Sequence, residues 1–102
     1  MSADDAYSAG LVCEHKKDLH TALQCFRIAD RRFRNYMRPD SDEVLAAQMG
    51  QVRCLVGLGR YQTAYLLATQ VLDLMGDRLA VRDVDRPSIL WYQAAAAAEL
   101  PH

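Results

Sequence analysis

Apolar residues recur at three- and four-residue intervals along most of this chain, which places them on one face of an α-helix. The segment that starts at Leu19 is the clearest case, and its apolar period continues to Phe33. Residues 77–86 alternate charged with small apolar positions, and we expect an ordered loop or short turn there rather than a strand. The predicted helices cover residues 2–16, 19–37, 41–57, 61–75 and 88–100.

Capping and helix-breaking residues support these boundaries. Ser2 and Asp5 form an S-x-x-D capping box at the start of the first helix. Pro39 ends the second helix, because proline disfavours helical geometry in the residue before it. Asp40 or Ser41 can then cap the third.

The chain also resembles itself at a distance of 42 residues. Leu19-His20-Thr21-Ala22 occupies the same place between two apolar segments as Tyr61-Gln62-Thr63-Ala64. The pairs that precede them, Lys17-Asp18 and Gly59-Arg60, both suit a turn. A fixed period of 20 to 50 residues is typical of solenoids, in which each unit buries its apolar face against a neighbour. The sequence therefore predicts an all-α fold, a right-handed solenoid of antiparallel helical hairpins.

Composition limits the function further. With 102 residues, about half of them apolar, the chain supports one small domain. A formal charge of −1 argues against a strongly electrostatic nucleic-acid or membrane binder. No stretch approaches the ~20 apolar residues of a membrane span, and the acidic start lacks the features of a secretory signal. Cys13, Cys25 and Cys54 lie in apolar segments, and we interpret them as reduced thiols of a cytoplasmic protein.

Several of these positions fit a known repeat signature of small and large residues where paired helices cross. The matching residues are Gly10, Leu19, Ala22, Phe26, Ala29, Gly59, Tyr61 and Ala64, and the linker at 38–44 fits as well. In these respects the chain resembles the tetratricopeptide repeat, in the longer form found in kinesin light chains. The resemblance implies two repeats, at about 4–37 and 42–76, followed by a capping or half-repeat helix at about 87–100.

The resemblance also implies a function. In this family the first helix of each hairpin lines a concave groove that takes a peptide or helix of a partner protein, as in scaffolds, adaptors and chaperones. The positions that correspond to the groove are Tyr7, Leu11, His15, Met49, Arg53, Val56, Ser88 and Trp91. Apolar members would supply affinity, and Arg53 would bond a carboxylate or carbonyl of the partner. The simpler interpretation is that Tyr7, Leu11 and Trp91 pack within the core. The lysines and asparagines of the chaperone-type carboxylate clamp are missing from the corresponding positions.

Two other functions remain open. The fifth helix offers Leu90 and Trp91 and has no following helix to cover it, so it could pair with a second copy or with further repeats. An arginine stripe on the second helix could bind nucleic acid or an acidic partner, although a solvated convex face explains it as well. The stripe consists of Arg27, Arg31, Arg34 and Arg38, with Arg32 beside it.

We expect no enzymatic activity, no catalytic residue, no cofactor and no metal. The spacing of Cys13, His15, His20 and Cys25 matches no common zinc pattern. The glycines at 57 and 59 lack the third glycine and the preceding strand of a phosphate-binding loop.

Overall fold

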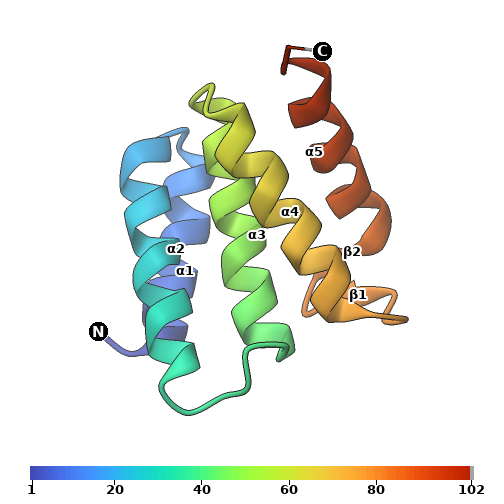
Figure 1. The fold of residues 1–102 in the computed structure, drawn as a ribbon. Helices are drawn as coiled ribbons and strands as arrows, with labels where there is room; N and C mark the ends of the chain where they lie inside the picture. Colours follow the sequence, from blue (N-terminus) through green and yellow to red (C-terminus); the bar gives the residue numbers. More distant parts are fainter. Residues whose placement is uncertain (102) are drawn as a thin grey trace.

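The computed structural model describes residues 1–101 and shows a helical chain with one small β-hairpin between its last two helices (Figure 1). The prediction of five helices is confirmed, with ends that differ by a few residues. The elements are α1 (Ala3–His15), α2 (Leu19–Arg34), α3 (Asp42–Gly57), α4 (Tyr61–Met75), β1 (Ala80–Val81), β2 (Val84–Asp85) and α5 (Arg86–Ala98).

Consecutive helices pack against one another, and α3 lies at the centre of the molecule. It contacts α2 and α4, its neighbours in sequence, and also α1 and α5 (Figure 1). Every residue from 44 to 52 is therefore buried, although these residues point to all sides of the helix. The smallest dimension of the molecule is 19 Å, which leaves room for two layers of helices about 10 Å across.

Side chains satisfy free backbone N–H groups at the starts of α1, α2, α3 and α5, whereas α4 has no side-chain cap. Ser2 Oγ accepts from the Asp5 amide at 3.1 Å, which confirms the first predicted cap. Of the two candidates for α3, Ser41 is the one that caps, accepting from the Val44 amide at 3.3 Å. Asp85 caps α5, a role that the sequence analysis missed.

The two turns that join α1 to α2 and α3 to α4 have the same geometry, 42 residues apart. Lys17 and Gly59 both take a positive φ, of 66° and 79°. The Asp18 amide donates to the Cys13 carbonyl at 2.9 Å, and the Arg60 amide donates to the Leu55 carbonyl at 2.8 Å. Each donor and acceptor is thus matched by a residue 42 positions later, so the self-similarity of the sequence extends to the backbone of the turns.

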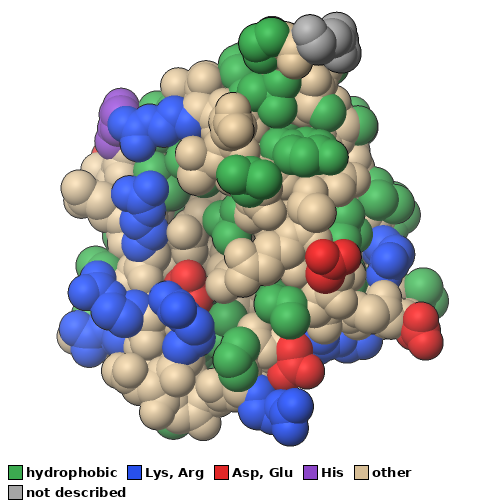
Figure 2. Space-filling view, in the orientation of Figure 1, with side chains coloured by type: hydrophobic (Ala, Val, Ile, Leu, Met, Phe, Trp, Pro, Cys, Tyr) green, Lys and Arg blue, Asp and Glu red, His purple; other side chains and the backbone are tan. Residues whose placement is uncertain are grey.

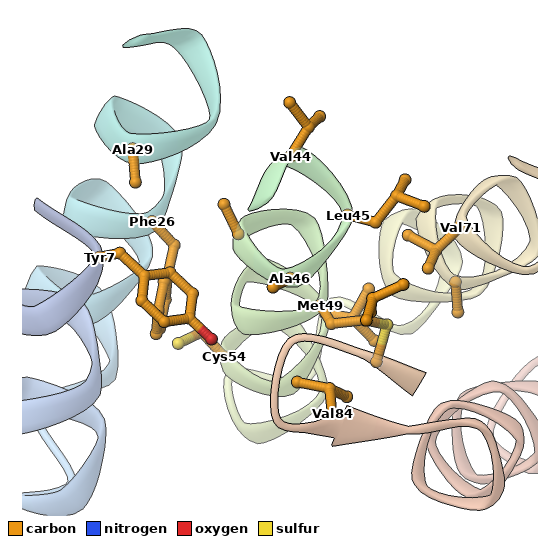
Figure 3. Packing of buried hydrophobic residues seen from close by; sticks show 14 of the residues in the cluster. Tyr7, Phe26, Ala29, Val44, Leu45, Ala46, Met49, Cys54, Val71 and Val84 are labelled. Carbon is orange, nitrogen blue, oxygen red and sulfur yellow. The ribbon is translucent and has the colours of Figure 1, made fainter. Parts of the chain in front are cut away.

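A single aromatic ring fills the junction between α1, α2 and α3. Phe26 of α2 is fully buried. A Cβ atom added at Gly10 of α1 would lie 2.8 Å from its ring, and one added at Gly50 of α3 would lie 2.5 Å away. Figure 3 shows Phe26 beside the ring of Tyr7, between these helices. Two glycines are needed because both backbones approach the same ring.

The prediction of no strand is wrong for residues 80–85. Val81 pairs with Val84 and Ala80 with Asp85 in an antiparallel hairpin, and Arg82 takes a positive φ of 54° in its turn. Val81 is fully buried and Val84 nearly so, because the hairpin packs against α3 and α5. This apolar anchoring orders a segment whose sequence alone resembles a loop.

The side chain of Arg78 holds the chain in place between the end of α4 and the hairpin. Arg78 donates through Nη2 to the Leu74 carbonyl at 2.8 Å and through Nε to the Met75 carbonyl at 2.9 Å. Its Nη1 lies 2.7 Å from an oxygen of Asp42, at the start of α3. Arg78 therefore satisfies free carbonyls at the end of α4 and ties that end to α3.

Candidate functional site

The site with the most varied chemistry is a pocket of about 350 Å³ between α1, α3, the hairpin and α5. No residue of α2 or α4 contributes to its lining. The lining combines aromatic, apolar, hydroxyl and charged side chains from segments far apart in sequence. These are Tyr7, Leu11, Glu14, Arg53, Asp83, Val84, Ser88 and Tyr92.

A two-point ion pair crosses the wall of the pocket between α1 and α3. Arg53 donates through Nε to Glu14 Oε2 at 2.6 Å and through Nη2 to Oε1 at 3.0 Å. Their side chains are only 15% and 23% exposed, so water screens the pair weakly. Burial alone would lower the pKa of Arg53, but the bonds and charge of Glu14 outweigh it and raise this pKa above its ordinary value. The Arg53 guanidinium also lies 5.7 Å from the centre of the Phe26 ring.

A second polar contact joins α1 to the hairpin. The Tyr7 hydroxyl donates to Asp83 Oδ1 at 3.3 Å. Burial raises the pKa of Tyr7, and the nearby charge of Asp83 raises it further. Arg82 places its guanidinium 4.8 Å from the centre of the Tyr7 ring and bonds Asp4 at 3.3 Å. The tyrosine is thus held in one position, with its hydroxyl at the pocket and its ring against the core.

These contacts leave the pocket with one carboxylate that has no cationic partner. Arg53 is paired with Glu14, and Arg82 with Asp4, whereas Asp83 accepts only the Tyr7 hydroxyl among the contacts found for residues 1–101. Aromatic and apolar side chains supply the remaining surface. Such an arrangement can hold a flexible chain by apolar contact and orient it by a few polar bonds.

The structure brings four of the predicted groove residues together and places the other four elsewhere. Tyr7, Leu11, Arg53 and Ser88 line the pocket. Met49 has no exposed surface and points from α3 toward α4 and the hairpin (Figure 3), so it is a core residue in this structure.

The remaining three groove candidates stay outside the lining for different reasons. His15 is exposed at the end of α1, and Val56 is half-buried near the end of α3. Trp91 is 63% exposed, on a part of α5 outside the pocket, so it does not pack within the core.

Four lining residues were missed: Glu14, Tyr92, Asp83 and Val84. Helical spacing could have found two of them, because Glu14 lies three residues after Leu11 and Tyr92 lies four residues after Ser88. Asp83 and Val84 depend on the hairpin, which the sequence analysis took for a loop.

The arginine stripe follows α2 on another part of the surface, where Figure 2 shows Lys and Arg side chains gathered. Arg34 pairs with Asp30 at 2.9 Å and Arg38 with Asp40 at 3.2 Å. Arg31 and Arg32 line a second hollow, of about 420 Å³, together with Ile28 of the same helix and Asn35, which caps its end. Binding of nucleic acid or an acidic partner there stays a prediction.

Family models, curated proteins and solved structures give no match to this chain. Among the described residues, no three His, Cys, Asp or Glu side chains are grouped so that they could hold a metal ion. In the same part of the chain, no helix is both long enough and apolar enough to cross a membrane.

Proposed function

We propose that this chain is a non-catalytic protein-interaction module that binds a peptide segment of a partner protein in the pocket between α1, α3, the hairpin and α5. One observation carries the proposal: four separate elements converge on one hollow and line it with aromatic, apolar and polar side chains. Peptide-binding sites combine these features, since apolar contacts supply affinity and a few polar groups set orientation.

The rigidity of the pocket supports this function. Glu14 and Arg53 lock α1 to α3, and Tyr7 and Asp83 lock α1 to the hairpin. A site whose walls are already fixed loses little conformational entropy when a ligand binds, so most of the ordering cost falls on the ligand.

The proposal includes the repeat family. The turns at Lys17 and Gly59 share their hydrogen bonds and positive φ at a separation of 42 residues. Helices α1, α3 and α5, the first members of the proposed units, are the ones that line the pocket. Both observations are expected of tetratricopeptide hairpins stacked with their first helices on one side.

A library of random twelve-residue peptides displayed on phage tests the proposal, with selected peptides then measured by fluorescence anisotropy. Ser88→Tyr places a bulky group at the pocket, and because Ser88 is exposed the fold should survive. We expect this variant to weaken selected peptides by about tenfold or more, a loss typical of a removed interface contact.

Ser8→Tyr is the matched control, because Ser8 is also exposed on a helix but lies outside the pocket. It should bind as the wild type does. Equal binding by Ser88→Tyr and wild type would show that the peptides attach elsewhere and would refute the pocket as the site. A selection that yields no binding peptide would refute the function itself.

A second candidate function is self-association through α5. Trp91 is 63% exposed and Leu90 45% exposed on this helix, and Leu66 of α4 is 59% exposed. Figure 2 shows hydrophobic side chains over α4 and α5. Large apolar side chains that are exposed on one surface favour contact with another protein chain.

Sedimentation equilibrium at chain concentrations from micromolar to millimolar tests this candidate. The measured mass of the wild type should rise to that of a dimer, and Trp91→Glu should keep the mass of a monomer. A single mass for the wild type throughout would exclude this candidate.

A further inference from the structure

We propose that the pocket selects peptide segments that carry a lysine or arginine side chain, and that Asp83 anchors the positive group. The inference rests on the proposed peptide-binding function and adds the chemical class of ligand.

The charge balance of the pocket carries the first step. Its one cationic lining residue, Arg53, gives two of its donors to Glu14, and both oxygens of Glu14 are thereby occupied. The nearby cation Arg82 is bonded to Asp4. With both cations paired, the charge of Asp83 is left over, so a positive ligand group is the one that the pocket attracts.

The position of Asp83 carries the second step. It lies in the exposed turn of the hairpin, between β1 and β2, and its backbone is held by the pairing of Val81 with Val84. Tyr7 donates to Oδ1, and for Oδ2 no donor is found within residues 1–101. A carboxylate with a free oxygen, fixed in direction by a neighbouring hydroxyl, is suited to a charge-assisted bond from an ammonium or guanidinium group.

The apolar part of the lining carries the third step. Leu11, Val84 and Tyr92 form a surface along which the methylene stem of a long basic side chain can lie. The Tyr92 ring adds an aromatic face within the same pocket, which also favours a cation.

The same arrangement disfavours an acidic ligand. A carboxylate would meet an Arg53 whose charge is already paired with Glu14, and it would approach the uncompensated charge of Asp83. The inference therefore differs from the sequence-based expectation that Arg53 bonds a carboxylate or carbonyl of the partner, because it gives the main polar contact to Asp83.

The first experiment uses small blocked amino acids as probes and follows their binding by the backbone amide chemical shifts of the ¹⁵N-labelled chain. N-acetyl-arginine methylamide should shift the amides of Leu11, Val84, Ser88 and Tyr92. N-acetyl-citrulline methylamide, which has nearly the same shape but no charge, should shift them several-fold less at equal concentration. Equal shifts from the two probes would overturn the inference, whatever the peptide library yields.

The second experiment applies a matched pair of variants to peptides selected by the wild type. Asp83→Asn keeps an acceptor for Tyr7 and removes the charge, and we expect it to weaken the peptides by about tenfold or more. Asp73→Asn removes another exposed carboxylate, on α4 and outside the pocket, and should leave affinity unchanged.

The outcomes separate this inference from the proposed function. Peptides that bind at the pocket but carry no shared basic position, or that tolerate Asp83→Asn, would overturn the inference and leave the function in place. Failure to select any peptide would refute both. Two losses of affinity would support both proposals. The selected peptides should bind the wild type more weakly when their lysine is replaced by norleucine, and the unchanged peptides should bind Asp83→Asn more weakly than the wild type.

Discussion

At the scale of single residues, the contact of Phe26 with two glycines decides how closely α1, α2 and α3 approach. A glycine inside a helix normally costs up to about 1 kcal/mol relative to alanine. Gly10 and Gly50 are therefore unfavourable as local choices, and only the ring between them explains their presence. The packing of three helices has overridden helix propensity at these two positions.

Gly50→Ala is expected to lower the free energy of unfolding by about 1–3 kcal/mol, because the new methyl group overlaps the Phe26 ring. Urea denaturation measures the loss. Phe26→Leu should remove most of the overlap, so Gly50→Ala should cost less in that background. Equal costs in the two backgrounds would show that the ring is not the obstacle.

The thiol of Cys54 is a second residue whose surroundings change its chemistry. It is fully buried in α3. Burial raises the pKa of Cys54 to about 11, the charge of Glu14 adds to this, and Arg53 partly opposes it. At pH 8 the thiolate, which is the reactive form, is therefore suppressed about a hundredfold relative to an ordinary thiol.

In a Cys13→Ser, Cys25→Ser background, iodoacetamide should modify Cys54 at least ~100-fold more slowly in native chain than in urea at pH 8. The raised pKa of Cys54 also makes the free energy of unfolding depend on pH. The unfolded thiol ionises first, so this stabilisation is complete below pH 9 and is lost as pH rises toward about 11. Cys54→Ala should flatten this alkaline decline. A rapid native reaction, or an unchanged slope, would contradict the burial of the thiol.

At the scale of elements, the turns at Lys17 and Gly59 show one geometry with two different residues. The positive φ suits glycine, whereas a side chain in this region costs about 1–2 kcal/mol. The first turn therefore carries strain that the second does not.

Lys17→Gly is expected to raise the free energy of unfolding by up to about 1 kcal/mol, and Gly59→Ala to lower it by about 1 kcal/mol. Thermal and urea denaturation give both values. Lys16→Gly is the control, because Lys16 has a φ of −78° and gains no relief; it should destabilise. A stabilising Lys16→Gly would mean that relief of strain is not the cause.

Most elements could be predicted from local signals, but the hairpin could not. Caps such as Ser2 and Ser41 act within one turn of their own helix, so the sequence contains the whole interaction. Strands of two residues are too short to show a period, and Val81 is buried because β1 packs against α3 while β2 packs against α5. The same reason explains why Asp83, in the turn of that hairpin, was missed.

At the scale of the whole molecule, four of the eight groove candidates implied by the repeat resemblance line the pocket, and tertiary packing places the other four elsewhere. Tyr7 and Leu11 face the pocket because their side of α1 does. Met49 is buried because α3 is covered on all sides, including the side that faces the hairpin. Whether α5 turns Trp91 toward the pocket depends on the chain path through residues 77–86, which periodicity does not give.

The pair between Glu14 and Arg53 joins the two proposed repeats. Arg53→Met should lower the free energy of unfolding by about 2 kcal/mol, because it leaves Glu14 half-buried without its partner. Glu14→Gln with Arg53→Met should cost less than the sum of the single changes. A double-mutant cycle in urea measures this coupling. Additive costs would show that the pair does not hold α1 to α3.

Phe26 lies before the connection between α2 and α3 at residues 35–41, yet one of its two glycine contacts, Gly50, lies after it. The boundary between the two proposed repeats in the sequence therefore does not coincide with a boundary in the packed core. A genetic event that spliced another hairpin into this connection would separate the ring from Gly50. If the chain is the proposed repeat array, each hairpin inserted at this point would therefore need its own glycine at the position in its first helix that corresponds to Gly50.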